Sequence, residues 1–174
     1  MPRRKIIGVM GSGKEDHTPL AAPLGRWIAQ QGFDLLTGAG QGVMATVSKA
    51  FYDVLQRSGV VLGIVPAGRP KSLYPNPWVE IAITTHLAGD GGPTAPDSRN
   101  HINVLSSDAV IALPGESGTS AEIELAMKYS KEIIIYWPDS PTTGKLPKGV
   151  PVAKSLDEVQ DFVLQATGKL TKKP

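Results

Sequence analysis

Short apolar runs alternate along the chain with stretches in which apolar residues recur at helical spacing. The apolar runs are continuous rather than alternating, which is typical of strands buried on both faces of a sheet. They predict strands at residues 5–10, 33–37, 60–65, 79–84, 109–113 and 132–137, and a short edge strand at 150–153. Helical spacing predicts helices at residues 18–31, 43–57, 98–106, 120–129 and 156–167. This order predicts an α/β, Rossmann-like fold: a doubly wound, mostly parallel sheet of six or seven strands flanked by helices, with right-handed crossovers.

No internal repeat, low-complexity tract or linker interrupts this pattern, so residues 1–174 are expected to form a single domain with basic, flexible ends. The Pro- and Gly-rich stretches at 66–78, 85–97 and 138–149 are expected to be loops within that domain. Ligands of such sheets bind beyond the carboxyl ends of the strands, where the strand order reverses. The loops that follow the strands are therefore where functional residues are expected.

Composition excludes several kinds of chemistry. At 41% hydrophobic and 20% charged residues the chain has the composition of an ordinary globular protein. It contains no cysteine, which excludes disulfides, zinc–thiolate sites, iron–sulfur clusters and a cysteine nucleophile. The three histidines are scattered and form no pair at i,i+4 with a carboxylate partner, so no metal site is predicted.

Charge is concentrated at the two ends. The formal net charge is +2, and six basic residues lie near the termini: Arg3, Arg4, Lys5, Lys169, Lys172 and Lys173. The remaining 12 basic residues are outnumbered by 16 acidic ones, so the body lacks the basic stripe of a nucleic-acid-binding protein. The ends are expected to be solvated. No apolar run approaches the ~20 residues that span a bilayer, so we expect a cytoplasmic protein with no membrane partner.

Two glycine-rich loops follow the first and second predicted strands. Gly11 and Ser12 begin a turn that can offer backbone N–H groups to an anion, or that simply turns tightly. Gly38, Gly40 and Gly42 alternate just before a helix, more glycine than a plain strand-to-helix turn requires. This spacing favours close approach of the backbone to an anion or nucleotide, with the next helix N-terminus directed at it. Met44, in that helix, is expected in the core rather than in contact with a ligand.

A third loop follows the fifth predicted strand and carries hydroxyl groups and glycines into a helix. Its candidate phosphate- or cofactor-binding residues are Pro114, Gly115, Glu116, Ser117, Gly118, Thr119 and Ser120. The helix is expected to begin at Gly118–Ser120, with Thr119 capping it or binding an oxygen anion. The loop is not a Walker loop, and the chain has no Gly-x-Ser-x-Gly elbow. Glu122 is expected in the first turn, either as a carboxylate favoured by the helix dipole or as a general acid/base.

Arg99 and its neighbours precede the fifth predicted strand. A guanidinium binds phosphate bidentately, so Arg99 is a candidate phosphate ligand, with an ion pair to Asp97 or Asp108 as the alternative. Asn100 is a further candidate binding residue. His101 is expected to be a helix-surface or packing residue rather than a ligand.

Taken together, these loops resemble the small Rossmann-like proteins once labelled lysine decarboxylases, a family that includes the LOG-type phosphoribohydrolases and the molybdenum cofactor carrier proteins. The LOG-type pattern is Pro-Gly-Gly-x-Gly-Thr-x-Glu-Glu, preceded by Arg-Lys and Ser-Asp-Ala. Here the corresponding stretches are Arg99-Asn100, Ser107-Asp108-Ala109 and Pro114–Glu122, and Gly42-Val43-Met44 is similar to the end of the family's glycine-rich loop. Three positions depart from the pattern: Asn100, Glu116 and Ala121.

The resemblance implies two alternative functions. The run from Ser98 to Asn103, together with Ala121, looks closer to the carrier branch, in which amides such as Asn100 and Asn103 would contact the edge of the pterin. That branch implies a cytoplasmic binding protein for a phosphorylated heterocycle, with molybdenum cofactor as cargo, and a homodimer or larger homo-oligomer formed through the helix that carries Ile123 and Met127. The LOG-type branch implies cleavage of the base–ribose bond of a nucleotide 5′-monophosphate, with Arg99 and Glu122 as catalytic residues. A structural dimer with a vestigial site is the third alternative.

Overall fold

The computed structural model describes residues 3–68, 70, 72–139 and 147–170. Seven parallel strands form one sheet in the order β4-β3-β2-β1-β5-β6-β7. The strands are β1 (Ile6–Met10), β2 (Asp34–Thr37), β3 (Val61–Val65), β4 (Ile81–Thr84), β5 (Ala109–Ala112), β6 (Ile133–Tyr136) and β7 (Val152–Ala153). Every pair of neighbouring strands runs parallel, which confirms the predicted fold class.

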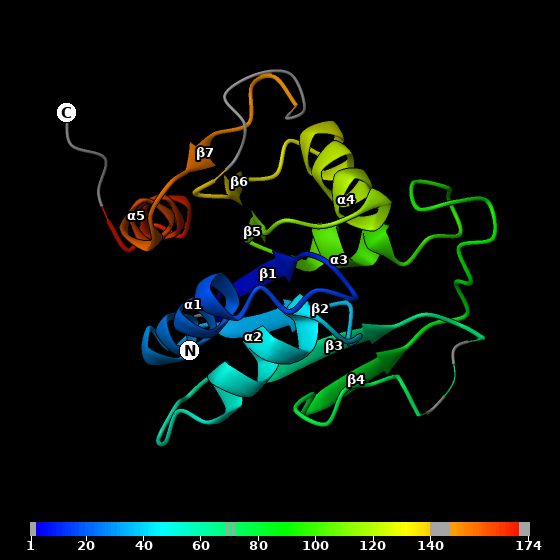
Figure 1. Cartoon of the computed structure of the whole chain (residues 1–174), viewed down its shortest axis with the longest axis horizontal. Coiled ribbons are helices and arrows are strands. Elements are labelled where there is room, and N and C mark those ends of the chain that lie inside the picture. The colour runs from blue at the N-terminus through cyan, green and yellow to red at the C-terminus, as the bar shows by residue number, and fades with distance from the viewer. Residues whose placement is uncertain (1–2, 69, 71, 140–146, 171–174) are drawn as a thin grey trace.

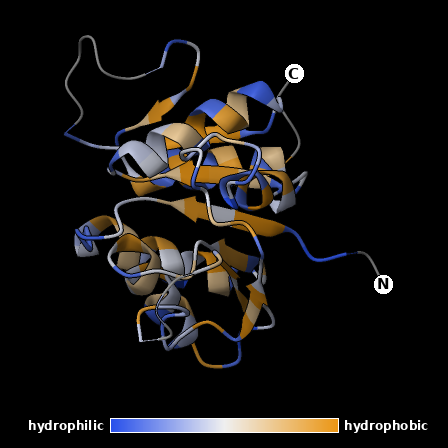
Figure 2. Ribbon diagram, turned by 90° about the vertical axis from the view of Figure 1, so that its right-hand side faces the viewer, coloured by the Kyte–Doolittle hydropathy of each residue, from blue (hydrophilic) through white to orange (hydrophobic). Residues whose placement is uncertain are grey.

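Within the described ranges, five helices cover the two faces of the sheet. They are α1 (Thr18–Gln30), α2 (Val43–Tyr52), α3 (Asn100–Ser106), α4 (Ser117–Lys128) and α5 (Leu156–Ala166). Helices α1, α2 and α5 pack on one face and α3 and α4 on the other (Figure 1). In Figure 2 the strands are predominantly coloured as hydrophobic and the helices as mixed. The continuous apolar runs of β1, β2, β3, β5 and β6 are thus buried strands, as their pattern predicted. The run that forms β4 differs, because β4 is an edge strand and all four of its residues are exposed.

The strand order reverses between β1 and β5, and this junction positions the candidate loops. The chain moves outward from β1 to β4 and then returns to place β5 on the other side of β1. Met10 and Ala112 are register partners, and the Leu113 amide donates a 2.8 Å hydrogen bond to the Met10 carbonyl. The loops that follow β1 and β5 therefore leave the sheet side by side.

Helix α4 begins earlier than its sequence predicted. It starts at Ser117, three residues before the expected start, and its N-cap is Glu116 in an extended conformation. The expectation that Thr119 caps the helix is wrong, because Thr119 lies inside the first turn and is buried. Glu122 consequently lies in the second turn rather than the first.

The basic residues of the ends contact the folded body where the structure describes them. Arg3 and Lys5 pair with Asp108 at 2.6 and 3.4 Å, and Arg4 pairs with Asp34 at 3.0 Å. The Nζ of Lys169 lies 4.1 Å from the centroid of the Phe33 ring. The side chains of Arg3, Arg4 and Lys5 stay 64, 50 and 42% exposed, so they are solvated as expected while they also contact acidic groups at the amino ends of strands. Lys172 and Lys173 lie outside the described residues.

None of the helices within the described ranges combines the length and the apolar character that a bilayer crossing requires.

Candidate functional site

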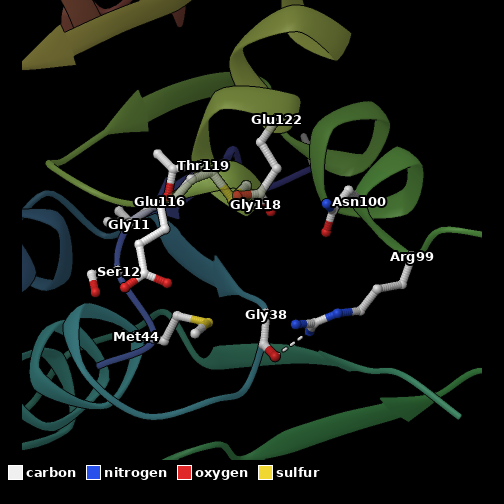
Figure 3. A pocket seen from close by; sticks show the side chains of 13 residues that line it. Gly11, Ser12, Gly38, Met44, Arg99, Asn100, Glu116, Gly118, Thr119 and Glu122 are labelled. Atoms are coloured by element: carbon white, nitrogen blue, oxygen red, sulfur yellow. Dashed lines mark hydrogen bonds between the residues drawn. The ribbon is translucent and has the colours of Figure 1, made fainter. Parts of the chain in front are cut away.

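A cavity of about 150 Å³ opens at the carboxyl edge of the sheet, where the loops after β1, β2 and β5 meet α3 and α4 (Figure 3). We call it the crest cavity. It is lined by Val9, Met10, Gly11, Ser12, Gly13, Gly38, Met44, Arg99, Asn100, Glu116, Gly118, Thr119 and Glu122. It lies at the junction of β1 and β5, the place where a doubly wound sheet binds its ligands.

The crest cavity brings together many of the residues singled out from the sequence. The predicted residues that line it are Gly11, Ser12, Gly38, Arg99, Asn100, Glu116, Gly118, Thr119 and Glu122. The predicted residues that do not line it are Gly40, Gly42, Pro114, Gly115, Ser117 and Ser120. That the lining residues bind a ligand remains a prediction, which the following sections develop as a proposal.

The three alternating glycines after β2 have different surroundings. Gly38 lines the cavity, and a side chain there would meet the Arg99 guanidinium at 2.7 Å. Gly40 faces Tyr74 instead. Gly42 has φ +61° and lies against the Ser12 carbonyl oxygen, to which the Val43 amide donates a 2.9 Å hydrogen bond. The first amide of α2 is therefore bonded to the β1–α1 loop and is not open toward the crest cavity. That α2 directs its N-terminus at a ligand stays a prediction.

Pro114 and Gly115 hold the loop after β5 against the loop after β1. The Ser12 amide donates to the Pro114 carbonyl at 3.1 Å. A Cβ on Gly115 would lie 2.1 Å from the Thr119 hydroxyl and 2.9 Å from the Ser12 nitrogen. Glycine is required here because two backbones approach each other closely. Pro114 and Gly115 therefore do not line the cavity, but they position the two loops that do.

The N-terminus of α4 forms one wall of the cavity. Glu116, the N-cap, makes no side-chain hydrogen bond to the helix. Gly118 lines the cavity, and a Cβ built there would meet no atom within 4 Å. The first amides of a helix carry partial positive charge and lack partners within the helix. A small anion is thus electrostatically favoured in front of Gly118.

A buried carboxyl group forms the floor of the cavity. The side chain of Glu122 lies one turn along α4 from Gly118, and its residue is only 8% exposed. The Nδ2 of Asn103, on α3, donates a 2.8 Å hydrogen bond to its Oε1. Burial raises the pKa of Glu122 to about 7, although the Asn103 hydrogen bond and the Arg99 charge act in the opposite direction. Near neutral pH this carboxyl group can therefore either give or take a proton.

Arg99 ties the opposite wall together. Its Nη1 donates to the carbonyl oxygens of Gly38 and Ile64, at the ends of β2 and β3. Its guanidinium lies 5.7 Å from the centroid of the Tyr74 ring. Figure 3 shows the side chain reaching from α3 across the cavity toward Gly38. Asp108, one of its two expected partners, pairs with Arg3 and Lys5. Arg99 thus supplies positive charge to the cavity while connecting this wall to the ends of β2 and β3.

Lys14 and Glu116 form an ion pair beside the cavity: Glu116 lines the crest cavity, whereas Lys14 lines a neighbouring cavity between α1 and α2. The Nζ of Lys14, in the loop after β1, lies 3.2 Å from Oε1 of Glu116. The carboxylate of Glu116 points across the mouth toward Ser12 and Met44 (Figure 3). Both side chains are largely exposed. A lysine therefore partly neutralises the carboxylate that departs from the LOG-type pattern.

The neighbours of Arg99 connect α3 to the irregular loop before it. Asn100 lines the cavity and its Nδ2 donates to the Pro93 carbonyl at 3.0 Å. His101 faces away from the cavity lining: its Nδ1 lies 2.6 Å from the Tyr129 hydroxyl, and its Nε2 lies 3.0 Å from the Ala95 carbonyl oxygen. These contacts confirm His101 as a packing residue.

Sequence reasoning assigned Asn103 and Met44 differently from the structure. Asn103 was a candidate for direct contact with a heterocycle, but it is fully buried and acts on Glu122. Met44 was expected in the core; it is indeed buried, yet it lines the cavity. Val9, Met10 and Gly13 also line it. Their position at the end of β1 was the available signal, because that strand borders the reversal of strand order.

The chain is similar in sequence to one protein family and in structure to several solved proteins. The profile of the SLOG cluster4 family matches residues 4–164. The molybdenum cofactor binding protein of the phototrophic bacterium Rippkaea orientalis is 32% identical, with a TM-score of 0.73 over 94% of this chain and 97% of that one. The molybdenum cofactor carrier protein of Chlamydomonas reinhardtii is 30% identical, with a TM-score of 0.74 over 95% of this chain and 99% of that one.

A rice protein represents the other branch. A probable cytokinin riboside 5′-monophosphate phosphoribohydrolase of Oryza sativa subsp. japonica is 30% identical over 125 residues, which are 69% of this chain and 46% of that protein. The match therefore spans less than half the length of the rice relative.

Proposed function

This chain belongs to the SLOG cluster4 family, and from that membership and the crest cavity we propose that it binds a phosphorylated heterocycle, with molybdenum cofactor as the cargo that it stores, protects and transfers. The observation that carries the proposal is the composition of the cavity lining: the open N-terminus of α4 at Gly118 lies across the cavity from the Arg99 guanidinium, and a buried, partnered carboxyl group lies between α3 and α4. The likeness to two molybdenum cofactor-binding proteins over nearly their whole length supports the choice of cargo.

Each part of the cavity has a role in this proposal. The amides of α4 and the Thr119 hydroxyl receive the phosphate of the cofactor, because they present donors and positive potential at the junction of β1 and β5. Arg99 adds a formal positive charge from the opposite wall. Asn100, a polar lining residue, offers an amide to the pterin edge. The chain has no cysteine, so no protein thiolate competes for the molybdenum and the cargo stays transferable.

A test of the carrier proposal measures retention and transfer of the cofactor. The protein is incubated under anoxic conditions with cofactor released from a molybdoenzyme, separated by gel filtration, and assayed for pterin and for reconstitution of an apo-molybdoenzyme. We expect pterin to elute with the protein, to be protected from oxidation and to transfer. Arg99→Ala should weaken retention. Arg26→Ala, a change on the outer side of α1, provides the matched control.

The second candidate function is hydrolysis of a nucleotide 5′-monophosphate, and the state of Glu122 favours it. A carboxyl group with a pKa of about 7 inside a cavity can act as a general acid or base near neutral pH. Incubation with AMP distinguishes the two functions. Release of adenine and ribose 5-phosphate that disappears in Glu122→Gln would establish the hydrolase and contradict the carrier proposal. The carrier proposal expects neither product.

A further inference from the structure

Glu116 has no visible role in building the helix that it begins. It is the N-cap of α4, a position where short polar side chains normally accept a hydrogen bond from the first turn, yet its side chain makes no such bond. Its contact with Lys14 is the ion pair that the structure shows for it, at 3.2 Å. The carboxylate is 58% exposed and stands at the mouth of the crest cavity. Its position is therefore better explained by what enters the cavity than by the stability of α4.

The backbones that carry the two charges are fixed, whereas the side chains can move. The loop of Lys14 is tied to the loop after β5 by the hydrogen bond from the Ser12 amide to the Pro114 carbonyl. The Lys14 amide itself donates to the Ser12 hydroxyl at 3.1 Å. The Lys14 side chain, by contrast, is 77% exposed. Glu116 can thus exchange its partner without any rearrangement of the fold.

We propose that Glu116 is a specificity-determining residue that competes with the phosphate of a ligand for Lys14. The inference rests on the proposed function, since it assumes that a phosphate enters the crest cavity. In the unliganded protein the Glu116 carboxylate is ion-paired with the ammonium group of Lys14. A phosphate that enters pairs with Lys14 in place of Glu116. The Glu116 carboxylate then moves away from the phosphate, because the two negative charges repel each other.

The exchange is energetically easy, which makes binding reversible. An exposed ion pair is typically worth no more than about a fivefold factor in an equilibrium constant, so the ligand loses little by breaking it. The remaining carboxylate still weakens the hold on a doubly charged phosphate. This weaker binding favours release of the cargo. Glu116 does not affect the binding of an uncharged part of the ligand.

The test compares AMP with adenosine, two probes that differ only in the phosphate. At low salt we expect Glu116→Gln to bind AMP about fivefold more tightly than the wild type, a factor that follows from one charge acting on a phosphate across several ångströms of water. Adenosine affinity should not change. At about 1 M salt, where the screening length is roughly 3 Å, the AMP difference should largely disappear. Calorimetric titration of the wild type and the variant measures the affinity for AMP at low salt, for adenosine, and for AMP at high salt.

Two further variants sharpen the result. Glu124→Gln removes the same charge from an exposed position of α4 that does not line the crest cavity, and should leave both affinities unchanged. Lys14→Gln should weaken AMP binding more in the Glu116→Gln background than in the wild type. In the Glu116→Gln variant Lys14 has no carboxylate partner at this position and interacts fully with the phosphate.

The outcomes separate this inference from the function on which it rests. Equal AMP affinity of wild type and Glu116→Gln, weaker binding by the variant, or an equal gain for adenosine would overturn the inference alone. If neither protein binds AMP or inorganic phosphate at millimolar concentration, the crest cavity captures no phosphate, and the proposed function fails together with the inference.

Discussion

The side-chain amide of Asn103 donates a 2.8 Å hydrogen bond to Oε1 of Glu122, and this bond joins α3 to α4 beneath the crest cavity. Asn103 is fully buried and Glu122 nearly so. Among the described residues, the Oδ1 of Asn103 has no hydrogen-bond partner. The Nδ2 of Asn103 is thus committed to the carboxyl group, which it holds in one orientation.

Glu122 should make the stability of the protein depend on pH. Its pKa is about 7 in the folded protein and near the ordinary value of 4.5 in the unfolded chain. Between these values the folded protein keeps a proton that the unfolded chain has lost, so the stability that this group contributes is present below pH 4.5 and is lost as the pH rises through 7. We expect Glu122→Gln to raise the free energy of unfolding by about 3 kcal/mol near pH 8 and hardly at all near pH 4.5.

Chemical denaturation of both proteins at the two pH values measures this difference. Glu124→Gln, an exposed change on the same helix, is the control and should show no such pH dependence. A gain of equal size at both pH values would mean that the carboxyl group of Glu122 is not the source.

Removal of the Asn103 amide should shift the pKa of Glu122 further upward. The hydrogen bond favours the ionised carboxylate, and its loss leaves burial less opposed. Asn103→Ala should therefore raise the pKa above 7 and lower the free energy of unfolding by about 1–3 kcal/mol. A carbon-13 NMR titration of the glutamate carboxyl groups follows the pKa directly.

Ser107→Ala is the matched control for that titration. It removes the 2.8 Å hydrogen bond from the Ser107 hydroxyl to the backbone carbonyl of Asn103, but leaves the amide of Asn103 in place. The pKa of Glu122 should stay where it is. An equal shift in both variants would show that general loosening of α3, rather than the amide, sets the titration.

The strands and the location of the cavity could be predicted from the sequence because both follow from local patterns. Buried parallel strands require continuous apolar runs, and a reversal of strand order leaves two loops side by side. Gly11 and Gly118 were found in this way: Gly11 lies in the loop after β1, and Gly118 lies in the first turn of the helix that follows β5.

The pairings inside the cavity could not be predicted, since they join residues that no local pattern connects. Asn103 and Glu122 are 19 residues apart and lie on different helices. Lys14 and Glu116 meet only because β1 and β5 are neighbours. The alternation of Gly38, Gly40 and Gly42 indicated close approach of the backbone, but three-dimensional packing decides which of them faces a cavity and which faces a loop.

Substitution of Gly118 should separate ligand binding from folding. A Cβ at Gly118 meets no atom within 4 Å, and alanine is a better helix former than glycine, by up to about 1 kcal/mol. Gly118→Ala should fold at least as stably as the wild type but lose affinity for AMP, because the methyl group occupies the space in front of the α4 amides. Thermal unfolding and calorimetric titration measure the two effects.

Gly115→Ala is the contrasting variant. Its Cβ would lie 2.1 Å from the Thr119 hydroxyl, so the loop must shift and the protein should lose stability. Unimpaired AMP binding by a fully folded Gly118→Ala protein would argue against an anion site at the start of α4.

Replacement of Arg99 by lysine should show that the guanidinium holds the ends of β2 and β3 in position as well as supplying charge. Arg99 donates through Nη1 to the carbonyl oxygens of Gly38 and Ile64 while its guanidinium lies beside the Tyr74 ring. Lysine can donate to carbonyl oxygens, but it lacks the planar guanidinium that packs against an aromatic ring at the same time. Arg99→Lys keeps the charge, yet we expect faster amide hydrogen exchange in residues 38–42 and a loss of AMP affinity of about tenfold. Arg57→Lys is the matched control, because Arg57 pairs with Glu80 at 2.7 Å and lies outside the crest cavity. That variant should lose stability without losing affinity. If Arg99→Lys bound AMP as the wild type does and left exchange in residues 38–42 unchanged, Arg99 would contribute only its charge.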